Sequence, residues 1–236
     1  MNNTYYETLD ENFAQALNLY EQPFSHEELI DLLKCGNIVQ KQIAALRLEC
    51  VKSVIDADIM MANLTGQDGK IREAVSLRLC EFMSNPDFID YFKNPKNYPI
   101  FLDAIIDING NICRNIIAAV SFLREDSAFC SIFCKGLIEL TNMLLNKIEV
   151  MDFQDGKYKV NKEVFKLYWC LETIYGFWDK LEFDELKQII LRAKNIEEYT
   201  IREKAAKILS LGFEDEDLLK ARIQLQNDHN YYVRRF

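Results

Sequence analysis

The side chains of this 236-residue chain with the greatest chemical potential are seven cysteines and two histidines. No Cys-x-x-Cys pair, Gly-rich phosphate loop, Gly-x-Ser-x-Gly elbow or His-Glu-x-x-His helix is present. Cys130 and Cys134 stand one helical turn apart, but zinc needs four ligands and His26 and His229 are both remote in sequence. An odd number of cysteines in apolar stretches is typical of free, buried thiols. We therefore expect no catalytic or metal-binding residue and no cofactor.

Charge and composition exclude several functional classes. The net charge is −9, whereas nucleic-acid binding requires a basic surface to neutralise phosphates. The first ten residues contain no Lys or Arg, unlike a secretory signal, and no apolar run approaches the roughly 20 residues that span a bilayer. We expect a cytoplasmic protein that binds neither nucleic acid nor membranes.

A hydrophobic residue followed by a basic one recurs at the start of amphipathic segments. The basic residues, used as markers of the pattern, are Lys41, Arg72, Arg114, Lys166, Arg202 and Arg234. The intervals between them are 31, 42, 52, 36 and 32 residues, in the range of stacked two-helix repeats. The residues three positions after the first five markers share one helical stripe, and we expect them to be buried: Ala44, Val75, Ile117, Trp169 and Ala205. Arg72 and Arg202 are expected to pair with backbone carbonyls or acidic groups.

Two copies of the pattern are clear. They read Asp68-Gly-Lys-Ile-Arg-Glu-Ala-Val-Ser-Leu-Arg-Leu79 and Glu198-Tyr-Thr-Ile-Arg-Glu-Lys-Ala-Ala-Lys-Ile-Leu209. These stretches resemble the second helix of a HEAT repeat, particularly the short repeats of bacterial lyase-type proteins. The resemblance implies an all-α fold, an α-solenoid of about five to six antiparallel helix pairs.

We expect residues 1–236 to form a single HEAT-like domain. Residues 1–24 contain a capping helix with Leu9, Phe13, Leu17 and Tyr20 on one apolar face, and residues 25–236 contain the repeats. The expected helix pairs are 25–35 with 38–54, 56–64 with 69–84, 98–108 with 111–125, 128–149 with 162–180, 184–194 with 198–211, and 215–226 with 230–236.

One insertion departs from the helical pattern. Asp155-Gly156 predicts a small β-hairpin near residues 151–160, with Phe153 opposite Tyr158. An isolated hairpin is marginal in water, so it either packs on its own solenoid or contacts a partner.

Arginines and aromatic residues supply the candidate partner-binding side chains. Arg47 and Arg78 each lie six residues after a marker and should be neighbours, either holding an acidic peptide or phosphate or forming salt bridges on a solvated face. Trp169 and Trp178 belong to a crowded aromatic helix that is either core or a concave groove.

The last stretch of the chain offers a further candidate surface. Tyr231 and Tyr232 open another repeat helix, which either folds back over residues 215–226 or forms an exposed edge that pairs with another molecule.

These features favour a non-enzymatic scaffold or adaptor that binds another protein or peptide on a concave helical surface. The alternative is a HEAT-like enzyme, since the resemblance extends to chromophore lyases and to alkylpurine DNA glycosylases, and Trp178-Asp179 provides an aromatic and carboxylate pair. The candidate partner-binding residues are Arg47, Arg78, Phe153, Tyr158, Trp169, Trp178, Tyr231 and Tyr232.

Overall fold

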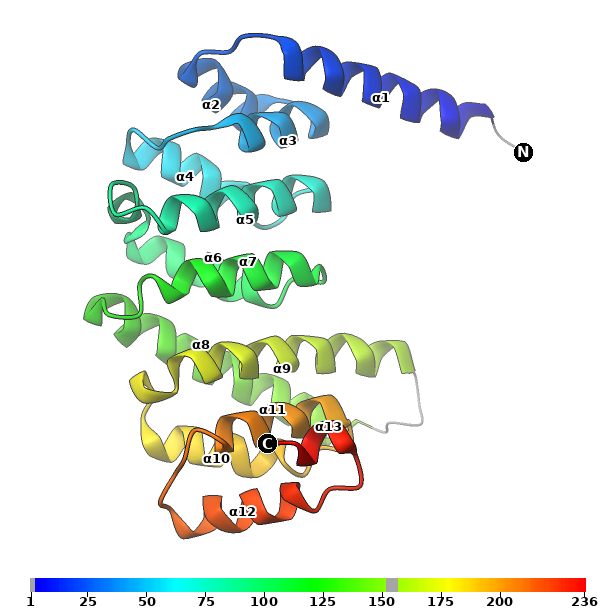
Figure 1. The fold of residues 1–236 in the computed structure, drawn as a ribbon. Coiled ribbons are helices and arrows are strands. Elements are labelled where there is room, and N and C mark those ends of the chain that lie inside the picture. Colours follow the sequence, from blue (N-terminus) through cyan, green and yellow to red (C-terminus); the bar gives the residue numbers. More distant parts are fainter. Residues whose placement is uncertain (1–2, 152–156) are drawn as a thin grey trace. The chain divides into compact units, whose positions relative to one another are not determined.

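The computed structural model describes residues 3–151 and 157–236, with the backbone alone for residues 3–10, 12 and 157–161. Within these residues the fold is all-α and contains no strand (Figure 1). The chain divides into two compact units, residues 1–100 with 114–122 and residues 101–113 with 123–236. The expectation of a single domain is not tested by this division and stays a prediction.

Unit 1 is built from the N-terminal helices. Its elements are α1 (Asn3–Glu21), α2 (His26–Cys35), α3 (Ile38–Arg47), α4 (Val54–Ala62), α5 (Gly69–Met83) and the 3-10 turns η1 (Ile89–Phe92) and η2 (Pro95–Asn97). Helices α6 (Tyr98–Ile105) and α7 (Gly110–Ser121) contribute residues to both units. Helix α3 packs against α1, α2 and α5, and α2 also contacts α4, so the helices of this unit meet neighbours one or two places along the chain.

Unit 2 repeats this packing. Its helices are α8 (Ser127–Glu149), α9 (Lys157–Phe177), η3 (Trp178–Lys180), α10 (Phe183–Ala193), α11 (Tyr199–Leu209), α12 (Glu216–Gln226) and α13 (Tyr231–Arg234). Helix α11 contacts α9, α10, α12 and α13, while α10 contacts α8 and α12. The core of this unit includes a cluster of Phe129, Phe133 and Phe177, whose ring centroids lie 4.8 to 6.4 Å apart.

Three of the marker arginines, Arg72, Arg202 and Arg234, recur because each has the same role at the start of its helix. Helices α5, α11 and α13 follow the N-cap residues Asp68, Glu198 and Asn230, whose side chains accept backbone N–H groups of the first turn. The arginine four residues after each cap donates through Nη1 to a carbonyl five residues before itself. These pairs are Arg72 with Gln67, Arg202 with Glu197, and Arg234 with His229. The pairing expected for Arg72 and Arg202 with backbone carbonyls is therefore confirmed.

The expected burial register is correct at four of its five positions. Ala44, Val75, Trp169 and Ala205 are buried, but Ile117 is only half-buried and Ile116 is fully buried instead. The cap at this helix is Asn109, which accepts the N–H of Asn111, so the residue four positions later is Cys113 and not Arg114. The register is therefore wrong by one residue in α7.

Helix boundaries differ from expectation in two places. Helix α3 ends at Arg47 and not at residue 54, because Ser53 caps a new helix and accepts the N–H of Asp56. Helix α9 begins at Lys157, so residues 157–160 are helical. The prediction that they form the second strand of a β-hairpin is therefore wrong. A lone hairpin is marginal, whereas these residues gain the hydrogen bonds of a long helix. The hairpin centre at residues 152–156 lies outside the described residues.

The N-terminal helix packs through a different face from the one expected. Helix α1 contacts α3, and Leu19 is its buried apolar residue among the described side chains. Phe13, Leu17 and Tyr20, which we expected to cover the first repeat, are exposed. The side chain of Leu9 lies outside the described set.

One helix among the described residues, α8, is long and apolar enough by length and composition to cross a membrane. Of its most apolar stretch, 44% is buried inside the protein, and α8 packs against α9 and α10. A core helix passes the same test, so this feature is weak evidence for a membrane span.

Burial within α5 provides a direct test of the register. Val75 is fully buried, whereas Leu77 on the same helix is 45% exposed. We expect Val75→Asp to lower the free energy of unfolding by several kcal/mol, about 3 or more, because an unpaired carboxylate would enter the core. The control Leu77→Asp should change it by less than about 1 kcal/mol. Urea unfolding followed by circular dichroism measures both, and equal losses would contradict the register.

Candidate functional site

Arg47 and Arg78 line one cleft of unit 1, as their spacing predicts. The cleft has a volume of about 760 Å³, and its lining residues are Tyr20, Phe24, His26, Leu29, Leu46, Arg47, Glu49, Cys50, Lys52 and Arg78. Nη1 of Arg47 donates to the carbonyls of Leu19 at 2.9 Å and Gln22 at 2.5 Å, at the end of α1. Its guanidinium also lies 5.2 Å from the centre of the Phe24 ring.

Arg78 likewise donates to carbonyl groups at the end of a helix, in this case α3. Its Nη2 donates to the carbonyl of Leu46 and its Nε to that of Ala45 at 3.4 Å, both in the last turn of α3. Its Nη1 pairs with Glu81 at 2.5 Å. Both arginines therefore satisfy carbonyl groups at helix ends, a structural role that the sequence did not suggest. Because both also line the cleft, they would lie next to a ligand bound there.

A thiol and an imidazole, Cys50 and His26, line this cleft, and the carboxylate of Asp56 contacts the imidazole from outside the lining. Cys50 Sγ lies 3.8 Å from His26 Nδ1, and His26 Nε2 lies 3.0 Å from Asp56 Oδ2. His26 is the first residue of α2, Cys50 lies in the connection after α3, and Asp56 is in the first turn of α4.

This grouping was not predicted from the sequence, because His26 is remote from Cys130 and Cys134 and the helical pattern of α3 was expected to continue through Cys50. The spacing Ser53-x-x-Asp56, a helix-capping signature, could have revealed the break before α4.

The two tryptophans of the candidate set have different surroundings. Trp169 is buried in unit 2, edge-on to Phe165 and Tyr168 at 5.9 and 5.2 Å, which supports the core and not the groove of the two alternatives given for it. Trp178 is half-buried and lies edge-on to Phe213 at 5.7 Å, while Asp179 forms an ion pair with Arg124. The aromatic and carboxylate dipeptide is thus engaged within its own unit.

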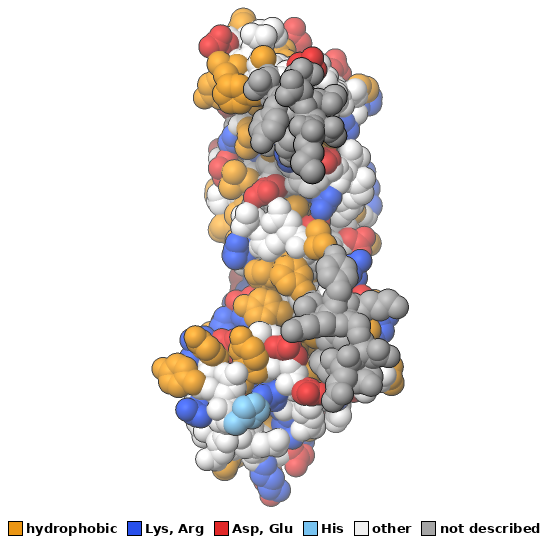
Figure 2. Space-filling model, turned by 90° about the vertical axis from the view of Figure 1, so that its right-hand side faces the viewer, with side chains coloured by type: hydrophobic (Ala, Val, Ile, Leu, Met, Phe, Trp, Pro, Cys, Tyr) orange, Lys and Arg blue, Asp and Glu red, His pale blue; other side chains and the backbone are white. Residues whose placement is uncertain are grey.

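The two tyrosines of α13 lie on the surface. Tyr231 and Tyr232 are 63% and 52% exposed. The next residue, Val233, is buried where α13 packs on α11 and α12. The helix therefore folds back through Val233, as the first alternative states, and leaves the tyrosines exposed. Pairing of this edge with another molecule stays a prediction. The lower part of Figure 2 shows hydrophobic side chains beside Lys or Arg side chains and a histidine.

Arginines lie against these rings. The Arg234 guanidinium is 5.9 Å from the Tyr231 ring centre, and that of Arg235 is 5.5 Å from the Tyr232 ring centre. Tyr199 of α11 adds a third exposed ring, 6.3 Å from Tyr232. We call these five residues, Tyr199, Tyr231, Tyr232, Arg234 and Arg235, the tyrosine–arginine surface.

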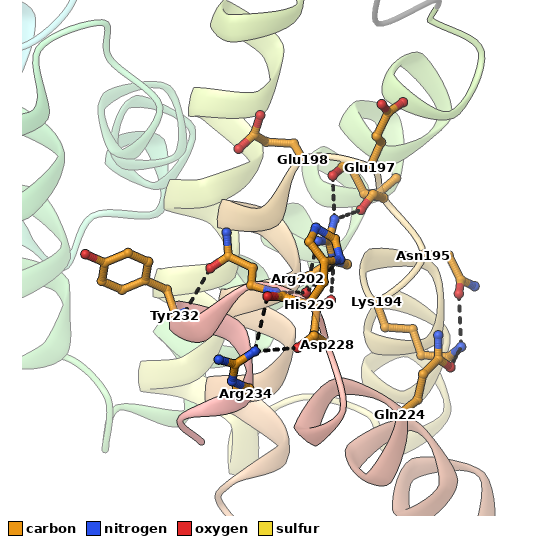
Figure 3. Close-up of polar contacts among 12 residues, drawn as sticks. Lys194, Asn195, Glu197, Glu198, Arg202, Gln224, Asp228, His229, Tyr232 and Arg234 are labelled. Atoms are coloured by element: carbon orange, nitrogen blue, oxygen red, sulfur yellow. Dashed lines mark hydrogen bonds and ion pairs between the residues drawn. The ribbon is translucent and has the colours of Figure 1, made fainter.

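A buried ion pair supports this surface. Arg202 donates from Nε to Asp228 at 2.7 Å and from Nη1 to the Ile196 carbonyl at 3.0 Å, and both side chains are only 9% exposed. Arg234 donates to the carbonyls of Asp228 and His229, which ties α13 to the same loop (Figure 3). In Figure 3 the Tyr232 ring points away from this cluster. The hydrogen bond from Arg202 lowers the pKa of Asp228, although partial burial opposes the shift.

Phe153 and Tyr158 complete the candidate set. Phe153 lies outside the described residues, and Tyr158 is in α9 with its side chain likewise outside them. Their role in partner binding stays a prediction.

The cysteines are free thiols with contrasting environments. Cys35 is exposed and Cys50 half-buried, whereas burial raises the pKa of the Cys134 and Cys170 thiols to about 12. Cys130 and Cys134 are both buried, and in the described part of the chain no group of three or more His, Cys, Asp or Glu side chains is arranged to hold a metal ion.

Comparisons with known proteins give little. No protein-family model matches the chain. No curated protein matches it either. Among solved structures, the crystal structure of an engineered protein aligns with this chain at 12% sequence identity and a TM-score of 0.47. The alignment covers 89% of this chain and 92% of the engineered protein. A similarity at that level carries no argument about fold or function.

The buried ion pair makes a testable contribution to stability. Asp228→Ala should lower the free energy of unfolding by on the order of 3 kcal/mol, because it leaves the Arg202 guanidinium buried without its carboxylate. The control Glu216→Ala removes an exposed ion pair with Lys220 on α12 and should cost less than about 1 kcal/mol. Chemical unfolding at pH 7 measures both.

The same pair predicts a pH dependence. Because folding lowers the pKa of Asp228, its contribution to stability is complete above the ordinary value of 3.8 and is lost as pH falls through the lower folded value. The difference in unfolding free energy between the wild type and Asp228→Ala should therefore shrink below about pH 4. A difference that stays constant from pH 7 to pH 3 would contradict the assignment.

Proposed function

We propose that this chain is a HEAT-like α-solenoid that serves as a scaffold or adaptor and binds another protein. Two features support the solenoid. Helices within each unit contact neighbours one and two places along the chain, and the cap followed four residues later by an arginine recurs at α5, α11 and α13. Repeats of this kind bury a continuous apolar seam between successive helices and leave long surfaces for partners.

The observation that carries the binding function is the tyrosine–arginine surface. Tyrosine and arginine are enriched among the residues that dominate the energy of protein interfaces, and two adjacent rings more than half exposed are available without rearrangement. The backbone contacts of Arg234 and the ion pair of Arg235 with Glu203, at 2.6 Å, hold both guanidiniums in place. These contacts reduce the side-chain entropy that the two arginines lose when a partner binds.

Charge indicates the kind of partner. The whole chain carries a net charge of −9, while the exposed Arg234 and Arg235 place two guanidiniums beside the rings, of which that of Arg235 is paired with Glu203. An acidic segment of another protein is attracted to such a surface, whereas a second copy of this acidic chain is repelled overall. We therefore assign to the surface a protein segment that presents carboxylates next to an apolar or aromatic side chain.

A binding experiment tests the proposal. A peptide library that varies acidic and aromatic positions is screened against the full chain, and the best peptide is titrated by fluorescence anisotropy. We expect the double variant Tyr231→Ala/Tyr232→Ala to weaken binding at least about tenfold, because truncating such anchors costs more than 1 kcal/mol each. Arg235→Glu should weaken binding and reduce its dependence on salt.

The matched control is Ile55→Ala, which removes an equally exposed apolar side chain, 69% accessible, from unit 1. It should leave the affinity unchanged. Equal weakening by the control, or tight binding by the double tyrosine variant, would assign the partner to another surface.

A further inference from the structure

We propose that Cys50, His26 and Asp56 form a nucleophilic thiol site in the cleft of unit 1, whose substrate is a small, negatively charged ester or thioester. The site lies between the ends of α2, α3 and α4 and shares no residue with the tyrosine–arginine surface. The two proposals therefore stand or fall separately.

The three side chains have the connectivity of a nucleophile, a base and an orienting group. His26 uses one ring nitrogen for each neighbour, with Nδ1 3.8 Å from Cys50 Sγ and Nε2 3.0 Å from Asp56 Oδ2. An ionised carboxylate only accepts hydrogen bonds, so the pairing with Asp56 assigns the ring proton to Nε2. The lone pair of Nδ1 then faces the thiol and can take its proton.

The carboxylate is held firmly in its charged form. Burial favours the neutral acid, but the backbone N–H of Lys52 at 2.9 Å, the His26 ring and the Ser53 hydroxyl at 3.0 Å all donate to Asp56 and lower its pKa. The His26 and Asp56 side chains are only 12% and 11% exposed. The imidazole is therefore fixed in orientation by a buried carboxylate.

The remaining walls of the cleft define the substrate. The volume of about 760 Å³ falls within the roughly 300–1,000 Å³ typical of small-molecule sites. Apolar side chains include Phe24 and Leu29, and the cations Arg47, Lys52 and Arg78 outnumber the single lining carboxylate, Glu49. Two carboxylates outside the lining pair with these cations, Glu27 with Lys52 at 3.3 Å and Glu81 with Arg78 at 2.5 Å, whereas Arg47 donates to backbone carbonyls. A small acyl compound with an anionic group matches this lining.

The reaction needs no redox partner. The Cys50 thiol gives its proton to Nδ1 of His26, and the sulfur electron pair attacks the carbonyl carbon. A carbon–sulfur bond forms, the bond to the leaving alcohol or thiol breaks, and that group takes the proton from Nδ1. Water then gives a proton to Nδ1 and its oxygen attacks the thioester, which releases a carboxylic acid and Cys50, whose sulfur regains the proton.

The proposal is tested with two activated esters on the full chain. Mono-4-nitrophenyl succinate carries a free carboxylate, and 4-nitrophenyl acetate lacks one. We expect a burst of 4-nitrophenolate with the acyl group on Cys50 in peptide mapping, and faster reaction with the succinate. Cys50→Ser should abolish the burst, while Cys35→Ser, which removes the exposed cysteine, should leave it intact. His26→Gln and Asp56→Asn should each slow acylation at least about tenfold.

A second measurement needs no variant. The rate at which iodoacetamide alkylates each cysteine of the wild-type chain is followed from pH 5 to 9 by mass spectrometry, with Cys35 as the internal reference. We expect Cys50 to be alkylated faster than Cys35 although Cys50 is less exposed, because the adjacent imidazole can accept its proton. Slower alkylation of Cys50 than of Cys35, acylation of Cys35 in preference to Cys50, or an unchanged acylation rate in a folded His26→Gln variant would overturn the proposal.

Discussion

The unsatisfied carbonyl groups at helix ends are the constraint on which this structure depends. Every α-helix leaves its last carbonyls without a partner in the helix, and a protein made of short helices has many such ends. Arg47 and Arg78 donate to the ends of α1 and α3, and Arg72, Arg202 and Arg234 donate to the loops that precede their own helices. A guanidinium suits this role because it offers five donors in a fixed plane and keeps its charge when partly buried. For Arg47 and Arg78 the positive charge is also attracted to the negative C-terminal end of the helix dipole.

This constraint shapes both candidate sites. Because Arg78 holds the carbonyls of Ala45 and Leu46, the chain leaves α3 in an extended connection that places Cys50 beside the first residue of α2. Because Arg202 and Arg234 fix the loop around Asp228, α13 is anchored by Val233 and its tyrosines are left in solvent. The residues that order the fold thus also determine which side chains meet a ligand.

The sequence predicted the helical class and much of the burial, and the reasons for its errors are physical. Periodicity reports which residues share a face, so Val75 and Ala205 were placed correctly. It does not report where a helix stops, and Ser53 and Asn109 changed the boundary and the register through single side-chain hydrogen bonds. Long-range groupings such as Cys50 with His26 depend on how separate helices pack, and no local pattern contains that information. Trp169 was expected both in the buried register and among the partner-binding residues, because an aromatic residue fits a core and an interface equally well.

The positions of the cysteines determine which thiols can be oxidised in the folded protein and which only after local unfolding. The four buried thiols, Cys113, Cys130, Cys134 and Cys170, all belong to unit 2, and the three accessible ones, Cys35, Cys50 and Cys80, belong to unit 1. Hydrogen-bonded, desolvated sulfur resists oxidants until the surrounding helices separate. Under oxidative stress, damage to the first set would therefore mark molecules whose second unit had transiently unfolded, while damage to the other set would accumulate on intact molecules.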